Sequence, residues 1–204
     1  MKIKICGLKH PDNIKAISAL SPDYMGFICY APSPRYASDL QAETLAFLPE
    51  SIYKTAVFVN EDAETITKLM DTYHFDAIQL HGNEDPDFCN TFRNEVTVIK
   101  AFGIDKDFDF GQLEEFGGHV DFFLFDTKTD KHGGSGKSFD WSLLNKYKLD
   151  VPFFLSGGLS PENLEEVKLI DHPQFYGVDL NSRFEIEPGL KDIDKLEKAF
   201  ELLK

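Results

Sequence analysis

Short apolar runs recur along the whole chain and alternate with segments that carry helical signals. Most of these runs lack strict polar alternation, which is typical of parallel strands that helices cover. They predict eight strands, at Lys2–Cys6, Tyr24–Cys29, Tyr53–Val59, Ala77–Leu80, Val96–Ala101, Val120–Asp126, Phe153–Ser156 and Phe175–Leu180. Because strands and helices alternate from one end to the other, the pattern favours an α/β fold with a parallel sheet.

Capping residues and amphipathic spacing predict helices in several of the intervening segments. These helices run from a cap at Ser38 or Asp39 to Leu48, from a cap at Asn60 over Glu61–Tyr73, from a cap at Ser160 with Pro161 at the first position, and over Asp192–Leu203.

The number of strand–helix units predicts a closed architecture. Eight units in 204 residues need short connections, and no linker or composition break divides the chain. We therefore expect one domain over residues 1–204, a single (β/α)8 TIM barrel with eight parallel strands. An open doubly wound sheet is the structural alternative, although no G-x-G-x-x-G follows the first strand.

Composition and charge narrow the function classes. A net charge of −14 argues against a nucleic-acid or anionic-membrane surface. No apolar run is long enough for a membrane span, and the first residues lack a signal peptide, so a cytoplasmic protein is expected. The three cysteines form an odd set without metal-ligand spacing. A disulfide framework is therefore not expected, and the open question is whether one thiol is catalytic.

Polar residues end most of the predicted strands, where the active site of such a barrel forms. They are Cys6, Asn60, Gln79 with His81, Lys100, Asp126, Ser156 and Asp179. Cys6 is either a small buried hydrophobic residue or, if its pKa falls toward neutrality, a base. Asp126 is either a partner for the following loop or a general acid whose pKa its apolar neighbours raise.

Three loops add candidate binding residues. Gly157 and Gly158 follow the seventh strand and, with the loop 179–182, lie where barrels often bind phosphate; a plain tight turn is the alternative. Arg35 follows a proline-rich stretch and is either solvated or positioned to pair with a substrate carboxylate. The glycine-rich segment 133–137 lacks P-loop spacing and predicts a mobile or close-packed loop over the mouth.

Several short strings, in order and mostly at strand ends, form a family pattern. They are Lys4-Ile5-Cys6-Gly7, Ser33-Pro34-Arg35-Tyr36, Val57-Phe58-Val59-Asn60, Gln79-Leu80-His81-Gly82, Asp126-Thr127 with Gly133-Gly134-Ser135-Gly136 and Phe139-Asp140-Trp141, Leu155-Ser156-Gly157-Gly158-Leu159, and Pro188-Gly189-Leu190-Lys191-Asp192. Together they resemble the phosphoribosylanthranilate isomerases over essentially the whole chain. The resemblance implies the Amadori rearrangement of N-(5-phosphoribosyl)anthranilate to 1-(2-carboxyphenylamino)-1-deoxyribulose 5-phosphate, a step of tryptophan biosynthesis.

The resemblance also implies a role for each candidate. Asp126 would protonate the furanose ring oxygen, and Cys6 as a thiolate would take the proton from C2. Arg35 would hold the anthranilate carboxylate, while Gln79 and His81 would line the pocket, with a structural imidazole as the alternative for His81. The phosphate site would comprise Gly157, Gly158, Asp179, Asn181 and Ser182.

The same resemblance bears on cofactors and partners. No metal or organic cofactor is implied, because the imine intermediate is itself the electron sink. The expected partner is a small-molecule phosphosugar, with no nucleic acid and no membrane, and a homodimer and a monomer both stay open.

One position departs from the family pattern, and two other functions compete. Arg183 stands where glycine is usual; either a left-handed backbone there costs roughly 1–2 kcal/mol, or the loop has another shape and Arg183 contacts the phosphate.

A bifunctional isomerase that also takes the histidine-pathway substrate would resemble this chain but carries aspartate where Cys6 stands. A non-catalytic barrel that binds a phosphorylated ligand would be expected to lack Cys6 or Asp126.

Overall fold

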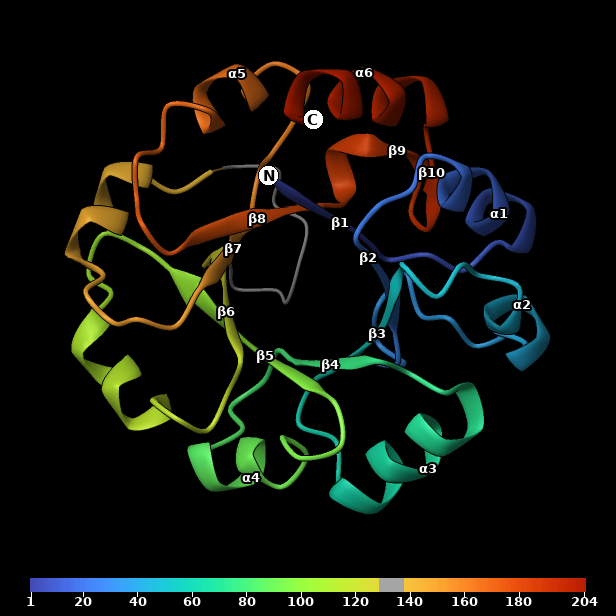
Figure 1. The fold of residues 1–204 in the computed structure, drawn as a ribbon, viewed down its shortest axis with the longest axis horizontal. Coiled ribbons are helices and arrows are strands. Elements are labelled where there is room, and N and C mark those ends of the chain that lie inside the picture. Colours follow the sequence, from blue (N-terminus) through green and yellow to red (C-terminus); the bar gives the residue numbers. More distant parts are fainter. Residues whose placement is uncertain (129–137) are drawn as a thin grey trace.

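Eight parallel strands close into a barrel in the computed structural model, which describes residues 1–128 and 138–204 (Figure 1). They are β1 (Lys2–Cys6), β2 (Tyr24–Ile28), β3 (Tyr53–Phe58), β4 (Ala77–Leu80), β5 (Thr97–Ile104), β6 (Phe122–Thr127), β7 (Phe153–Leu155) and β8 (Phe175–Leu180). The last strand pairs with the first, and Lys4 lies opposite Asp179. This closure confirms the predicted barrel, and the open-sheet alternative is wrong. The predicted glycine-rich loop at 133–137 lies outside the described residues.

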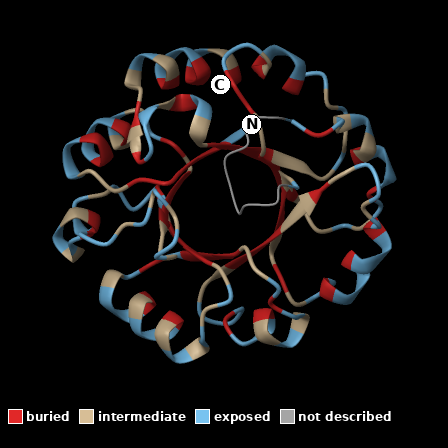
Figure 2. Ribbon diagram, turned by 180° about the vertical axis from the view of Figure 1, so that it is seen from behind, coloured by how far each residue is buried: buried red, intermediate tan, exposed pale blue. Residues whose placement is uncertain are grey.

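Helices and 3₁₀ turns form a layer around the barrel. They are α1 (Pro11–Ala19), α2 (Ala42–Ala46), α3 (Ala63–Tyr73), α4 (Pro86–Asn90), η1 (Phe110–Phe116), η2 (Trp141–Lys146), α5 (Leu164–Val167), η3 (Ser182–Phe184) and α6 (Ile193–Leu203). Figure 2 shows the buried ring of strands at the centre and helices whose outer faces are exposed. Within the two described stretches, every helix is too short or too polar to cross a membrane.

The caps of two long helices differ in how well they were predicted. Asp192 caps α6, since its side chain accepts a hydrogen bond from the first turn, and this helix is confirmed to within one residue. The prediction that Asn60 caps the helix after β3 is wrong. Asn60 has a left-handed backbone, with φ of 52°, and its side chain accepts from the Asn83 N–H instead. Asp62 is therefore the extended residue that caps α3.

Two other predicted helices differ from the structure, one in its length and one in where it begins. The helix expected to reach Leu48 is reduced to the five residues of α2, which begins after Gln41 without a side-chain cap. Ser160 caps no helix; its N–H donates to the Asn163 side chain, and α5 begins after that turn. Local capping signals therefore located these segments but did not fix their ends, which agrees with the dominance of tertiary packing over propensity in short helices.

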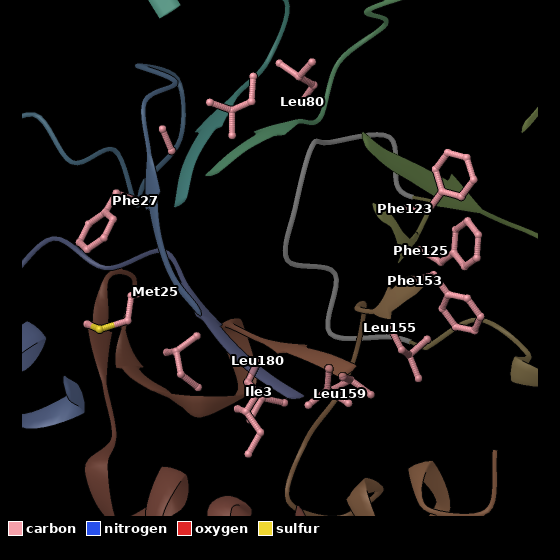
Figure 3. Close-up of a cluster of buried hydrophobic side chains, with 14 of the residues drawn as sticks. Ile3, Met25, Phe27, Leu80, Phe123, Phe125, Phe153, Leu155, Leu159 and Leu180 are labelled. Atoms are coloured by element: carbon pink, nitrogen blue, oxygen red, sulfur yellow. The ribbon is translucent and has the colours of Figure 1, made fainter. Parts of the chain in front are cut away.

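Side chains of the strands alternate between an outer core and the barrel interior. In Figure 3, Phe27, Phe123 and Phe125 point away from the barrel axis toward the surrounding layer. A separate interior cluster contains Tyr24, Ile99, Ala101, Leu124 and Phe154, with Phe122 and Tyr176 packed against it. Because Leu124 precedes Asp126 by two residues on the same face of β6, this aromatic plug lies below the polar residues of the mouth.

The chain after β8 forms a short hairpin, and the backbone of Lys191 at its end is hydrogen-bonded to the Asn13 side chain of α1. The strands of the hairpin are β9 (Glu185–Glu187) and β10 (Leu190–Lys191), and their register places Lys191 opposite Glu185. Gly189 turns the hairpin with φ of +91°. Arg183 lies in η3 and has no positive φ, so the left-handed strain considered for this position is wrong and the loop has the alternative shape.

We expect Arg183→Gly to give no gain in stability. Since the backbone at this position is not left-handed, glycine would relieve no strain and would only add freedom to the unfolded chain. The free energy of unfolding should therefore fall by about 0.5–1 kcal/mol relative to Arg183→Ala. Urea unfolding of both variants measures this difference, and a glycine variant more stable than the alanine variant would contradict it.

Candidate active site

Cys6 ends β1 with its thiol buried inside the barrel mouth. It pairs in register with Gly26 of β2, and a β-carbon at Gly26 would lie only 2.7 Å from the Cys6 Sγ. Glycine at this position therefore leaves the space that the thiol occupies. Cys6 is 3% exposed, and strand alternation places Lys4 on the same interior face.

A buried ion pair joins β1 to β8 beside this thiol. The Lys4 Nζ lies 3.0 Å from the Asp179 Oδ1, and the two side chains are 0% and 5% exposed. Burial opposes the charge of Lys4, but Asp179 and Cys6 raise the Lys4 pKa above its ordinary value, so the ammonium stays charged. Asp179 was predicted to bind phosphate. The structure directs its carboxylate at Lys4, and its part in phosphate binding stays a prediction.

The charge state of Cys6 differs from the expected thiolate. Burial raises the pKa of the thiol above its ordinary value, and the Asp179 carboxylate adds to the rise. Lys4 and Lys191 act in the opposite direction without cancelling these effects. From the sequence, a base role for Cys6 depends on a thiol pKa lowered toward neutrality. The thiol pKa is raised instead, because desolvation outweighs the two nearby ammonium groups.

Asp126, the last residue but one of β6, has the raised pKa that its apolar strand predicts. Its Oδ1 accepts a 2.7 Å hydrogen bond from the Thr127 N–H. Burial raises the pKa of the carboxyl to about 6, and Asp179 contributes to the rise, whereas Thr127 and Lys4 lower it. The predicted shift is confirmed, and at pH 7 about a tenth of the molecules carry the protonated acid.

Gln79 and His81 form a chain of side chains that ends at Asp126. The Gln79 Nε2 lies 3.2 Å from the His81 Nδ1, and the His81 Nε2 lies 3.7 Å from the Asp126 Oδ2. A cavity of about 760 Å³ opens beside them, with His81, Lys100 and Asp126 in its walls. The structure thus brings together the residues that end β4 and β6.

The first glycine after β7 packs directly against Asp126. Gly157 and Gly158 have φ of +83° and +69°, which favours glycine at both positions. A β-carbon on Gly157 would lie 2.3 Å from the Thr127 backbone nitrogen and 2.7 Å from the Asp126 Oδ1. Gly157 is therefore required by the close approach of β6, whatever else its N–H group binds.

A second charged network surrounds Arg35, whose side chain packs against Gly7 just after β1. The Arg35 guanidinium makes hydrogen bonds of 2.8–3.0 Å to both carboxylate oxygens of Glu185. Glu185 also lies 2.7 Å from the Lys191 Nζ, which in turn donates to the Asn181 Oδ1 at 2.7 Å. Of the two alternatives for Arg35, a solvated side chain and a positioned cation, the structure shows the positioned cation.

The network has a defined charge state and lies close to β1. Burial lowers the pKa of Lys191 to about 8 despite Glu185. Burial opposes the Glu185 charge, but Arg35 and Lys191 hold the pKa of that carboxyl below its ordinary value. A β-carbon at Gly7 would lie within 3 Å of both the Arg35 and the Asn181 side chains, so these two residues meet across β1. Ser182, half-buried, begins η3 beside them.

Sequence reasoning missed three of these charged residues, Lys4, Glu185 and Lys191. For Lys4 a signal exists, because it precedes Cys6 by two residues and so shares its strand face. For the other two, the only signal is the Pro188-Gly189 turn that separates them. Within residues 1–128 and 138–204, no group of three or more His, Cys, Asp and Glu side chains could hold a metal ion.

The fold and the site together define the class of the protein. A closed barrel with a thiol, a carboxyl of raised pKa and several ordered cations at its mouth is a (β/α)8-barrel enzyme that transfers protons on a small anionic substrate.

Known proteins narrow this class to one family. The family model for N-(5'-phosphoribosyl)anthranilate (PRA) isomerase matches residues 3–202. The chain is 48% identical to the enzyme of that name from Parabacteroides distasonis, over 97% of this chain and 90% of the relative. The solved phosphoribosyl anthranilate isomerase from Thermotoga maritima superposes with a TM-score of 0.85 at 32% identity, over 99% of this chain and 98% of the other.

A further solved structure bears on the ligand. That phosphoribosyl anthranilate isomerase is in complex with reduced 1-(o-carboxyphenylamino)-1-deoxyribulose 5-phosphate, with a TM-score of 0.81 and 29% identity over 98% of this chain and 97% of the other. The chain belongs to the N-(5'-phosphoribosyl)anthranilate isomerase family. It is an isomerase of tryptophan biosynthesis that carries out the Amadori rearrangement of N-(5-phosphoribosyl)anthranilate.

We expect Asp126→Asn to stabilise the fold at neutral pH. A carboxyl whose pKa is about 6 in the folded state and near 3.9 when unfolded loses stability as pH rises between these values. Asparagine has no charge to bury, so the gain should be about 2–3 kcal/mol at pH 7.5 and much smaller at pH 4.5. Urea unfolding at the two pH values measures it. An equal effect at both, or a loss at pH 7.5, would contradict the expectation.

Proposed function

We propose that Asp126 is the general acid and Cys6 the general base of the rearrangement. The Asp126 carboxyl donates its proton to the furanose ring oxygen, and the bond from C1 to that oxygen breaks to give the protonated Schiff base. The Cys6 thiolate then takes the proton from C2, and the electron pair moves into the C1–C2 bond while the imine nitrogen becomes an enamine. The resulting enolamine tautomerises to the ketone. The carboxyl pKa of about 6, close to the range of an effective acid, is the observation that carries this assignment.

The raised pKa of Cys6 sets how this mechanism operates. At neutral pH only a small fraction of molecules combines a protonated Asp126 with an ionised Cys6. That fraction is reactive, because a thiolate of high pKa is a stronger base toward the carbon-bound proton. Lys4 and Lys191 favour it, since both ammonium groups lower the thiol pKa against the effect of burial.

Substrate binding divides between the two sides of the mouth. Arg35 would hold the anthranilate carboxylate through its Nη1, which makes no hydrogen bond to any residue that the structure describes. The product analogue bound by the solved relative carries such a carboxylate. The phosphate would lie against the N–H groups of Gly157 and Gly158, with Asn181 and Ser182 opposite.

The pocket between these ends would be lined by Gln79 and His81. The Gln79 Oε1 is buried and has no hydrogen-bond partner in the described part of the chain. A buried acceptor of this kind costs free energy unless it is satisfied, and a sugar hydroxyl would satisfy it. His81 faces Asp126 and would help to orient the acid. A cytoplasmic location, a homodimer and a reaction without metal or cofactor stay predictions.

Removal of either proton-transfer group should lower turnover strongly. General acid–base groups typically contribute about 10²–10⁴-fold, so Cys6→Ser and Asp126→Asn should each lower kcat by that much. KM should change less, because neither group is proposed to hold the substrate's phosphate or carboxylate. Steady-state turnover of freshly prepared N-(5-phosphoribosyl)anthranilate measures both constants. Near-normal turnover in one variant would remove that residue from the mechanism.

The pH dependence of kcat/KM should show that the productive form has the group of lower pKa protonated and the group of higher pKa ionised. The productive form needs Asp126 protonated and Cys6 ionised, although the carboxyl pKa is about 6 and the thiol pKa lies above its ordinary value. The kcat/KM should therefore rise up to about pH 6, stay level, and fall only above the ordinary thiol range. Asp126→Asn should remove the alkaline fall, since no acid is left to ionise. A fall that begins near pH 6 would contradict this order.

A further inference from the structure

A further buried ion pair, outside the acid–base pair and the substrate-binding residues, lies beside His81. The Lys100 Nζ of β5 is 3.1 Å from the Glu84 Oε2 in the loop after β4. The two side chains are 2% and 3% exposed. Taking two charges out of water costs free energy, and apolar residues often replace such a pair without loss of stability. Fold stability is therefore a weak reason for this pair.

The contacts of the pair converge on the backbone at His81. The Lys100 ammonium donates to the carbonyls on either side of this residue, Leu80 at 3.3 Å and Gly82 at 2.8 Å. The Glu84 carboxylate accepts from the Gly82 N–H, at 2.9 Å and 3.2 Å to its two oxygens. The peptide groups before and after His81 are thus held by one ion pair.

The same carboxylate connects this loop to the loop after β3. The Asn60 N–H donates to the Glu84 Oε1 at 2.8 Å, and the Asn83 N–H donates to the Asn60 Oδ1 at 2.6 Å. A β-carbon at Gly82 would lie 2.3 Å from that Asn60 oxygen. Because Gly82 is already in close contact with Asn60, the loop that carries His81 has no room to shift toward β3. The hydrogen bonds of the Glu84 carboxylate to Asn60 and Gly82 hold the two loops in this arrangement.

The side chain held in this way is the one that faces the acid. The His81 Nε2 is 3.7 Å from the Asp126 Oδ2, and its other ring nitrogen contacts Gln79. Neither Glu84 nor Lys100 is among the charges that shift the Asp126 pKa, which are Asp179 and Lys4. The pair therefore has a geometric route to Asp126, through His81, and no direct electrostatic one.

We infer that Glu84 and Lys100 are positioning residues that hold His81 against Asp126 during the rearrangement. The inference rests on the proposed acid role of Asp126. It explains why an ion pair is kept where an apolar pair would fit, and why both of its members bind peptide groups next to one imidazole.

The test is the paired substitution Glu84→Gln with Lys100→Met. It removes both charges at similar volume, so the urea midpoint should stay near that of the wild type. The grip on His81 is lost, and kcat should fall about 10- to 100-fold with a smaller change in KM, as a misplacement of about 1 Å can cost that much. Glu84→Gln alone keeps an acceptor for the Asn60 N–H and should give a smaller fall in kcat, but its urea midpoint should be lower because the Lys100 charge is left unpaired. His81→Ala, in which the ion pair is intact, serves if the pair variant does not fold.

A double-mutant cycle with His81→Ala separates positioning from a general effect on the fold. In the His81→Ala background, the pair substitution should lower kcat by no more than about twofold further, because the residue it acts through is gone. The matched control is Lys54→Met with Asp76→Asn, an ion pair between the second residue of β3 and the residue before β4, outside the cavity that His81, Lys100 and Asp126 line. Its kcat should equal that of the wild type.

Three results would overturn the inference: normal kcat in the pair variant, normal kcat in His81→Ala, or losses that multiply in the combined variant. Asp126→Asn reports separately on the acid. If that variant loses turnover and the cycle shows no coupling, the positioning pair alone is refuted. If Asp126→Asn turns over normally, both the acid role and the inference are refuted.

Discussion

Closure of the barrel between β1 and β8 is the constraint on which the rest of the site depends. Lys4 and Asp179 are 175 positions apart in the chain, and only the pairing of the first strand with the last places them 3.0 Å apart. The strand register fixes Cys6 one alternation above Lys4 on the same interior face. The charges of this ion pair act on both proposed proton-transfer groups, since Lys4 and Asp179 each contribute to the pKa of Cys6 and of Asp126. An open sheet with the same strands would have neither the pair nor its field.

Burial at the mouth favours the proposed role of Asp126 as an acid and opposes that of Cys6 as a base. Desolvation raises the pKa of every acidic group, so one environment cannot give a carboxyl that holds its proton and a thiol that loses it. The structure gives Asp126 the shift it needs and leaves Cys6 with a raised pKa. Two ammonium groups, Lys4 and Lys191, lie near the thiol and work against that rise. Burial is the largest effect on both groups, and the cations near the thiol reduce the rise of its pKa without reversing it.

The strands could be read from the sequence because burial of a short apolar run is a local property. The bounds of β1, β4 and β8 match the prediction, whereas β5 extends to Ile104, beyond its predicted end at Ala101, because it pairs with β6 as far as Thr127. Helix ends were read less well. Asn60 is a residue type that often caps helices, but its backbone is left-handed in this structure. Asp62, two residues later, therefore caps the helix.

The site was predictable only where the barrel itself decides position. Residues at strand ends meet at the mouth in any such fold, which is why Cys6 and Asp126 could be found. Glu185 could not be found in that way, because its partner Arg35 is 150 positions away and the hairpin that carries it is an addition to the barrel. A long-range ion pair leaves no periodicity in the sequence, so its members look like ordinary surface charges until the fold brings them together.

The ion pairs also explain how a chain of net charge −14 can bind a doubly anionic substrate. Charges on the outer surface are screened over about 8–10 Å at physiological salt, so the global charge acts weakly inside the mouth. There, Lys4, Lys191 and Arg35 are each ordered by a buried carboxylate before any ligand arrives. Such cations attract an anion less strongly than free ones, but their orientation no longer has to be fixed on binding. Preorganised donors of this kind stabilise charge that develops during the reaction, which favours the transition state over simple accumulation of anions.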